Sequence, residues 1–291
     1  MGRSVPLTPI ILSKGRATVE VALPLLSMMG VSGTLLPTSL LSTHTGSGFE
    51  GFTFLDLSGE MKKIVAHWKR LGLQFDAAYV GYLGSSDQID FLIQELPSLL
   101  KPGAKFYLDP VMADNGEFYT GFDAAYAQKM KSLAQLADVL LPNQTELSLL
   151  FDLPYQEGVA GLEDIQSAVD TLSHQSKSTA LIVTGAGYDG QGQIGAYVSD
   201  PSTHTEKLLQ APFIAGRFHG TGDIFASLVV GAMENGASLE ESTKFAVDSL
   251  SQVVQTSIQE PKVNQEGMAF EAFGEKFATF ARSCREKRVE G

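Results

Sequence analysis

The sequence predicts an α/β protein in which helices cover both faces of one mostly parallel central sheet. Short apolar runs alternate with longer amphipathic segments along most of the 291 residues, a rhythm typical of strand–helix units in parallel sheets. Polar or small residues follow four of the expected strands. No internal repeat and no interdomain linker interrupts this pattern, so we expect residues 1–291 to form a single domain.

The helices are predicted from apolar side chains that recur at helical spacing. In residues 58–71, for example, Met61, Val65 and Trp68 fall on one face, and Gly72 follows as the expected C-cap. On the same grounds, helices are expected over residues 17–29, 58–71, 87–99, 122–136, 145–151, 162–174, 221–235, 239–258 and 268–282.

The strands are predicted from short apolar runs bounded by turn residues. They are expected over residues 33–37, 77–80, 105–108, 139–141, 180–184 and 193–198. At the carboxyl ends of four of them the sequence reads Gly81-Tyr82, Asp109-Pro110, Pro142-Asn143 and Thr184-Gly185. Ligands of open parallel sheets bind outside the carboxyl ends of the strands, so we expect the functional site at this edge.

The charge balance narrows the classes of ligand. Lys and Arg number 21 against 33 Asp and Glu, which gives a formal net charge of −12 at pH 7. This excess of negative charge argues against a nucleic-acid binder, because phosphate contacts along a nucleic acid need basic side chains. A small anionic ligand must instead be attracted by local devices, such as helix N-termini, backbone amides or a bound metal.

Cys284 is the single cysteine, which excludes an intramolecular disulfide and a zinc site built on two cysteines of this chain. Its place in the charged segment 282–288 predicts a solvated helix end. Pro6 and Pro9 interrupt the N-terminal apolar stretch, which argues against a secretory signal. No window reaches the roughly 20 apolar residues of a membrane span. We therefore expect a cytoplasmic protein with no nucleic-acid or membrane partner.

The segment Gly220-Thr221-Gly222-Asp223, directly before an apolar helix, is a candidate site for phosphoryl transfer. Two glycines let the backbone approach a ligand closely and point its amides at developing negative charge. Asp223 could accept the proton of an attacking hydroxyl group. The alternative interpretation is an ordinary helix start after a glycine turn, where aspartate is favoured anyway.

Three carboxylates form a second candidate cluster. Asp109 ends a strand, Asp114 lies in the loop after it, and Glu146 opens a helix after Asn143. On neighbouring strand ends these side chains could hold Mg²⁺ through water molecules, an arrangement suited to a nucleotide phosphate. Taken singly, the residues could equally be an Asp-Pro turn, a polar loop and a helix cap. Their expected convergence with Asp223 at one sheet edge favours the functional interpretation.

Together these motifs resemble those of the pyridoxal kinases in the ribokinase superfamily. Residues 109–116 are similar to the Asp-Pro-Val-Met-Gly-Asp loop of that family, with Ala113 in place of its glycine. Residues 142–146 are similar to its Pro-Asn-x-x-Glu motif, and residues 220–223 match its Gly-Thr-Gly-Asp motif. His44-Thr45-Gly46 and Gly81-Tyr82 are similar to segments that line the vitamin pocket. The resemblance runs from about residue 35 to residue 258.

The resemblance implies a ribokinase-like three-layer sandwich and an ATP-dependent kinase for the 5′-hydroxymethyl group of pyridoxal, pyridoxine or pyridoxamine. It implies that Asp223 is the catalytic base and that Gly220, Thr221 and Gly222 hold the transferred phosphoryl group with backbone amides. It also implies a lid over residues 113–121 and a homodimer.

The remaining implied roles concern the nucleotide, the metal and the vitamin. Asn143, Glu146 and Asp114 would arrange Mg²⁺ and the phosphates of ATP, Thr184 would touch a phosphate, and Asp109 would help to place a metal, including a monovalent cation such as K⁺. Thr45 and Tyr82 would contact the vitamin ring. Residues 7–18 depart from the family pattern, and Ser13 is the serine nearest to the position of a substrate-contacting serine.

Two other functions are compatible with the motifs. Hydroxymethylpyrimidine kinases of thiamine synthesis also act on a small hydroxymethylated ring, but they often carry cysteine at the position of Asp223. A non-catalytic binder of pyridoxal phosphate would bind the vitamin phosphate without consuming ATP. The intact Asp223 argues against both.

Overall fold

The computed structural model describes most of the chain. The described residues are 4–7, 11–12, 17–43, 51–155, 162–174, 179–188, 192–216, 218–260 and 263–290. Ser13 and Thr45, two of the expected substrate contacts, lie outside them.

Within the described residues, eight strands form the central sheet in the order β13-β12-β11-β10-β7-β6-β1-β3. The six strands from β11 to β3 are parallel, and β12 and β13 extend the sheet antiparallel at one edge. The bounds are β1 Ser4–Leu7, β3 Ser32–Leu35, β6 Phe75–Val80, β7 Leu100–Leu108, β10 Val139–Leu140, β11 Ala180–Ala186, β12 Gln193–Asp200 and β13 Thr205–Pro212.

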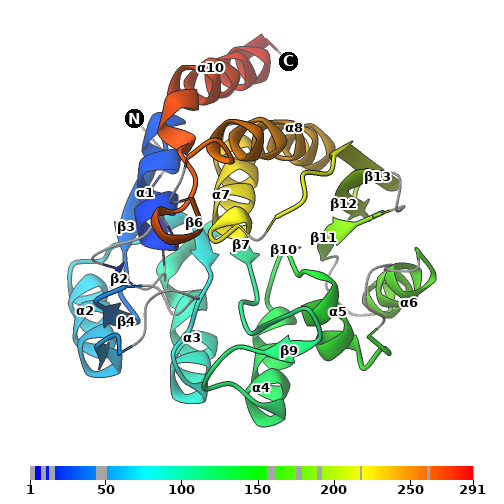
Figure 1. Cartoon of the computed structure of the whole chain (residues 1–291). Helices are drawn as coiled ribbons and strands as arrows, with labels where there is room; N and C mark the ends of the chain where they lie inside the picture. The colour runs from blue at the N-terminus through cyan, green and yellow to red at the C-terminus, as the bar shows by residue number, and fades with distance from the viewer. Residues whose placement is uncertain are drawn as a thin grey trace.

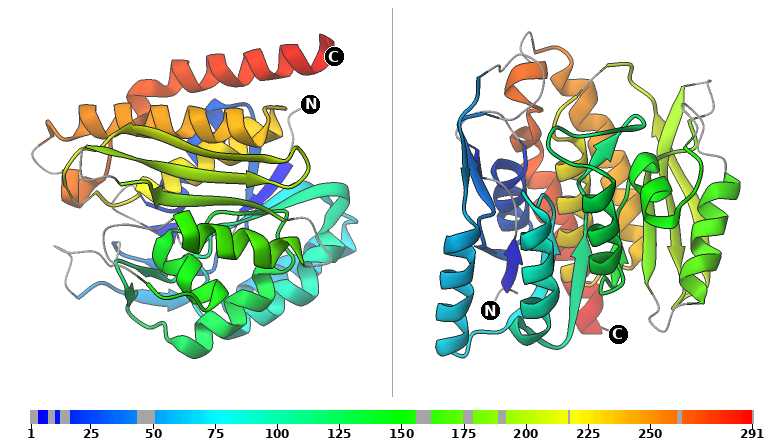
Figure 2. Two further views of the ribbon diagram at one scale, coloured as in Figure 1. Left: turned by 90° about the vertical axis from the view of Figure 1, so that its right-hand side faces the viewer. Right: turned by 90° about the horizontal axis from the view of Figure 1, so that it is seen from below.

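Helices cover both faces of this sheet, which confirms the predicted fold class (Figure 1). One layer consists of α1 (Val19–Met28), α7 (Thr221–Glu234), α8 (Leu239–Ser257) and α10 (Gly274–Glu290). The other consists of α2 (Ser58–Arg70), α3 (Ser86–Leu99), α4 (Ala124–Ala134), α5 (Gln144–Phe151) and α6 (Leu162–Ser173). Successive strand residues point to opposite faces, so Tyr79 and Tyr107 pack into the first layer and Ala78 and Phe106 into the second. Figure 2 shows the two layers from the side.

Several short elements were not predicted. The strands β2 (Ile11–Leu12), β4 (Ser39–Leu41) and β5 (Phe54–Asp56) form a small separate sheet, and β8 (Ala113–Asp114) and β9 (Glu117–Phe118) form a hairpin. These strands have two or three residues each, too few for a periodic pattern. The longer β13 carries Glu206 and Lys207 on an edge, and its strand conformation depends on pairing with β12.

The C-terminal helix differs from its prediction in both extent and environment. A 3₁₀ turn, Phe270–Phe273, precedes α10, and the helix continues to Glu290 rather than ending at residue 282. The expectation of a solvated position for Cys284 is wrong, because only 4% of this residue is exposed. It falls on the face of α10 that packs into the first hydrophobic layer.

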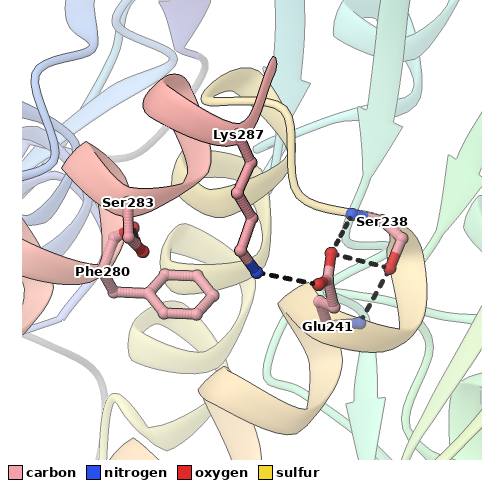
Figure 3. A network of polar contacts seen from close by, with 5 residues as sticks. All are labelled: Ser238, Glu241, Phe280, Ser283 and Lys287. Atoms are coloured by element: carbon pink, nitrogen blue, oxygen red, sulfur yellow. Dashed lines mark hydrogen bonds and ion pairs between the residues drawn. The ribbon is translucent and has the colours of Figure 1, made fainter. Parts of the chain in front are cut away.

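Polar contacts also hold α10 in place. Lys287 Nζ lies 3.5 Å from Glu241 Oε1, and Glu241 forms with Ser238 the capping box that begins α8 (Figure 3). The Arg285 guanidinium donates to the carbonyl oxygen of Met29 and to Asn235 Oδ1. The helix end is therefore anchored to α1, α7 and α8. In the part of the chain that the structure describes, no helix combines the length and the apolar character needed to cross a membrane.

Candidate active site

The N-terminus of α7 presents backbone amides at the carboxyl edge of the sheet. Gly220 is the N-cap in a left-handed conformation, with φ 82° and ψ 5°, which glycine adopts without strain. The first intrahelical bond runs from the amide of Ile224 to the carbonyl oxygen of Gly220 at 3.0 Å. The amides of residues 221–223 precede this bond and are therefore available to an anion. Gly222 is exposed, and open space lies where a Cβ atom would be.

Asp223, in the first turn of α7, has its carboxyl group held by a residue distant in sequence. The backbone N–H of Thr18, just before α1, donates to it. Burial raises the pKa of Asp223 above its usual value, and this hydrogen bond partly opposes the rise. Thr18 has φ 51° and ψ −115°, a left-handed conformation that a β-branched residue rarely adopts. A raised pKa is what a carboxylate needs to accept a proton near neutral pH.

Asp109 and Glu146 form a buried carboxylate pair beside Asp223. Burial raises the pKa of Asp109 well above its usual value, and the charge of Asp223 raises it further. Burial also raises the pKa of Glu146, and the charge of Asp109 adds to this effect. Glu146 Oε1 accepts from the amide of Met112 at 3.1 Å, and its Oε2 accepts from the amide of Asn143 at 2.9 Å. These amides orient Glu146 and lower its pKa, but burial raises the pKa by more.

The carboxylate pair fits a hydrated magnesium ion. Mutual repulsion between buried carboxylates is the condition that a divalent cation relieves. Mg²⁺ usually keeps several water molecules and takes only one or two protein carboxylates besides the phosphates of its substrate. Asp109 and Glu146 meet that requirement. In the described part of the chain no group of three or more His, Cys, Asp or Glu side chains is placed to hold a metal ion directly, so a closed protein cage is not formed there.

The segment predicted as a lid contains the β8–β9 hairpin. Its turn consists of Asn115 and Gly116, both with positive φ, and the amide of Gly116 donates to Thr145 Oγ1 at 3.0 Å. Asp114 is exposed and accepts hydrogen bonds from Asn115. The bond to Thr145 connects the hairpin to the start of α5. Ala113, the first residue of the hairpin, is completely buried.

Tyr119, which follows the hairpin, was not predicted as a site residue. Although 41% of the residue is exposed, partial burial raises the pKa of its phenol, and the charges of Glu146, Asp114, Asp109 and Asp223 add to the rise in that order. This one side chain therefore lies within electrostatic reach of every acidic residue of the site. The sequence indicated Tyr119 through its position within residues 113–121, the predicted lid.

Asn143 and Thr184 lie together on adjacent strand ends, joined by an isolated parallel bridge. Asn143 Oδ1 accepts from the amide of Glu146 at 2.9 Å, and its Nδ2 donates to the carbonyl oxygen of Ala113 at 2.8 Å. Asn143 thus links the helix start to the hairpin. Its predicted contact with a nucleotide phosphate is not tested by these bonds.

Tyr82, shortly after β6, belongs to a small apolar cluster. It packs with Ala17, Leu41 and Phe52, and its backbone carbonyl oxygen accepts from Thr38 Oγ1 at 3.3 Å. Ala17 directly precedes Thr18, whose amide contacts Asp223, so the chain leads from this cluster to the candidate base. The small sheet contributes Leu41 of β4 to the cluster.

Known proteins resemble the chain over most of its length. The phosphomethylpyrimidine kinase family profile matches residues 13–268. A putative phosphomethylpyrimidine kinase from Bacteroides thetaiotaomicron, solved with pyridoxal, is 32% identical with a TM-score of 0.88, covering 95% of this chain and 96% of that one. Pyridoxal kinase from Lactobacillus plantarum is 30% identical with a TM-score of 0.87, covering 97% of this chain and 98% of that one.

Comparison of sequences finds relatives of the same kind as comparison of structures. The hydroxymethylpyrimidine/phosphomethylpyrimidine kinase of Haemophilus influenzae is 27% identical, covering 83% of this chain and 87% of that protein. The chain spans less than half of two longer relatives, 46% of one from Caenorhabditis elegans and 34% of one from Arabidopsis thaliana.

The fold and the comparisons together define the class of protein: an α/β protein of the ribokinase superfamily, related to the pyridoxal kinases. More specifically, the chain belongs to the phosphomethylpyrimidine kinase family. The predicted resemblance is confirmed.

Proposed function

We propose that the protein transfers the γ-phosphoryl group of ATP to the 5′-hydroxymethyl group of pyridoxal, pyridoxine or pyridoxamine. The observation that supports this most is the convergence of Asp223, the amides of residues 221–223 and the Asp109–Glu146 pair at one sheet edge. Relatives that share the fold at 30–32% identity include a pyridoxal kinase and a structure solved with pyridoxal.

In this reaction, each group has a role that follows from its chemistry. Asp223 accepts the proton as the hydroxyl oxygen bonds to the γ-phosphorus and the bond from phosphorus to ADP breaks. The amides of residues 221–223 stabilise the charge on the phosphoryl oxygens. Asp109 and Glu146 would hold Mg²⁺ through water, and the ion supplies further neutralisation of phosphate charge. The β8–β9 hairpin would act as the lid that excludes water competing for the phosphoryl group.

The other expected partners and contacts stay predictions. They are phosphate contacts by Asn143, Asp114 and Thr184, the vitamin contacts by Thr45 and Ser13, a monovalent cation near Asp109, the homodimer and the cytoplasmic location.

Phosphorylation of hydroxymethylpyrimidine is the second candidate function. The matching family profile and the Haemophilus influenzae relative both favour it. Stacking on the predicted ring contact Tyr82 would not distinguish the two substrates, since a pyridine and a pyrimidine are both flat aromatic rings.

The test is ATP consumption with Mg²⁺ in the presence of pyridoxal, pyridoxine, pyridoxamine or hydroxymethylpyrimidine. We expect turnover on the pyridines that falls about 10²–10⁴-fold in Asp223→Asn, the contribution of a general base. Affinity for ADP should stay unchanged. Asp164→Asn, the same chemical change in the first turn of α6, should leave turnover intact. Turnover confined to the pyrimidine would select the second function, and an active Asp223→Asn would exclude Asp223 as the base.

A further inference from the structure

A buried glutamine outside all of the motifs connects α3 to its neighbouring segments. Gln88 lies in the first turn of α3, and only 1% of it is exposed. Its side-chain oxygen accepts from the amide of Gly84 at 2.7 Å. Its side-chain nitrogen donates to the carbonyl oxygen of Thr38, just before β4, at 3.0 Å, and to Ser58 Oγ, at the start of α2, at 2.9 Å. Asp56 Oδ2, 3.2 Å away, is a further acceptor for this nitrogen. The reverse orientation would set the NH₂ group against the N–H of Gly84, so these bonds fix the side-chain amide.

The short loop after β6 is hydrogen-bonded by side chains at three successive residues. The bonds run from Thr38 Oγ1 to the carbonyl oxygen of Tyr82 at 3.3 Å, from the Tyr126 hydroxyl to the carbonyl oxygen of Leu83 at 2.8 Å, and from the amide of Gly84 to Gln88 Oε1 at 2.7 Å. The Tyr82 ring also packs against Phe122, with the ring centroids 5.4 Å apart. Because Gln88 bonds the carbonyl oxygen of Thr38 as well, these two side chains hold the backbone on both sides of Tyr82.

This loop begins beside the acidic residues of the site. The amide of Asp109 donates to the carbonyl oxygen of Val80 at 2.9 Å, so the ends of β6 and β7 meet where the loop starts. Tyr82 packs with Leu41 of β4, and the chain between β4 and β5 contains Thr45, the other predicted ring contact. The segments that carry both predicted ring contacts are therefore joined to the buried amide of α3.

We propose that Gln88 is a positioning residue that sets the place of the substrate ring by holding the Tyr82 loop to the start of β4. A buried amide with both polar ends paired favours one arrangement of these segments, because another arrangement would leave buried polar groups unpaired. The effect of Gln88 on the substrate rests on the proposed function. Its hold on the loop is a property of the folded protein and can be measured without substrate.

The first experiment measures backbone hydrogen exchange by mass spectrometry in Gln88→Met, in which methionine keeps the side-chain length without the amide. Asn235→Ala is the matched control, because Asn235 is also a buried amide with hydrogen bonds but lies at the opposite end of α7 from the site. We expect the amide of Gly84 to exchange about tenfold faster in Gln88→Met, since it loses its acceptor, and within about twofold of the wild-type rate in Asn235→Ala. An unchanged rate in Gln88→Met would overturn the hold of Gln88 on the loop.

The second experiment compares the same variants in the ATP-dependent assay. We expect Gln88→Met to raise KM for the ring substrate about tenfold and to keep KM for ATP within about twofold, because a displaced ring contact weakens binding of the ring alone. Asn235→Ala should keep both KM values within about twofold. A KM for the ring substrate that stays unchanged, or that rises together with KM for ATP, would overturn the positioning role.

Two further arrangements keep these outcomes decisive. If Gln88→Met does not fold, Thr38→Val replaces it in both experiments, since it removes the bond to the carbonyl oxygen of Tyr82 and leaves the shape of the side chain nearly unchanged. The same faster exchange of the loop and the same difference between the two KM values are then expected, at about threefold. A wild-type protein without turnover on any ring substrate would refute the proposed function, and hydrogen exchange would still decide whether Gln88 holds the loop.

Discussion

Thr18 supplies the amide that contacts Asp223 at the cost of an unusual backbone conformation. Its φ of 51° and ψ of −115° match the first central position of a type II′ turn, which is dominated by glycine. Such conformations cost about 1–3 kcal/mol in other residues and cluster at functional sites. The carbonyl oxygen of Thr18 also accepts from the amides of Val21 and Ala22, so the same residue begins α1 and orients the candidate base.

Replacing Thr18 with glycine should therefore stabilise the fold. Glycine relieves the backbone strain, and its greater conformational entropy in the unfolded chain offsets part of this gain. We expect Thr18→Gly to raise the free energy of unfolding by about 1 kcal/mol. Urea denaturation measures the change. Ala17→Gly is the matched control, because Ala17 is not among the positive-φ residues and should lose about 0.5–1 kcal/mol. A loss of stability in both variants would show that Thr18 is not strained.

At the scale of whole elements, α10 is held by a polar cluster between α1 and α7. Asn235 Nδ2 donates to the carbonyl oxygens of Met29 at 3.0 Å and Gly231 at 2.6 Å, and Asn235 Oδ1 accepts from Arg285. Only 4% of Asn235 is exposed. Its side chain thus links the ends of two helices to the last helix of the chain.

Asn235→Ala should destabilise the protein by about 2–3 kcal/mol, because it leaves buried carbonyl oxygens without their donor. Gln252→Ala is the control, since Gln252 is an exposed amide of α8 that accepts one hydrogen bond from Lys276. We expect a change within about 0.5 kcal/mol for this control. Chemical denaturation of the two variants decides the point, and equal losses would contradict the anchoring role of Asn235.

At the scale of the whole molecule, the sheet brings acidic residues from three strand–helix units to one edge, and two of them, Asp109 and Glu146, are buried. Asp109, Glu146 and Asp223 all have pKa values raised above the usual 3.8–4.5, mainly by burial. Between the usual and the raised values, the folded state binds more protons than the unfolded state. The free energy of unfolding must therefore fall as the pH rises through this range.

We expect the free energy of unfolding of the protein without ligands to fall as the pH is raised from about 4.5, the upper end of the usual carboxyl pKa values, towards the raised values of the folded state. Each unit of pKa shift corresponds to about 1.4 kcal/mol, so the loss is measurable by denaturation at a series of pH values. Asp109→Asn should make the free energy of unfolding depend less on pH, because it removes one titrating carboxyl group and its repulsion of Glu146 and Asp223. Mg²⁺ should stabilise the protein more at the higher pH, where the carboxylates are ionised. A stability that rises with pH over this range would contradict the burial of these acids.

Much of the fold could be predicted because its signals are local. The helix at residues 58–71 and the strand at residues 180–184 follow from side-chain spacing within a single segment, and the structure places elements there. The site prediction depended on residues at strand ends, and Asp109, Glu146 and Asp223 do come together. The short strands β2, β4 and β5 escaped prediction because their pairing, rather than their own sequence, stabilises them.

The sequence by itself determined the alternation of strands and helices and the acidic and glycine residues at the strand ends, because periodicity and turn chemistry act between neighbours in the chain. Only the tertiary structure decided that the Thr18 amide contacts Asp223, that Asp109 and Glu146 are buried together and that Cys284 is buried. These residues lie far apart in sequence, and their contacts exist because the packing of helices onto a twisted sheet brings them together. No local pattern records which distant side chain will fill a given space in a close-packed interior.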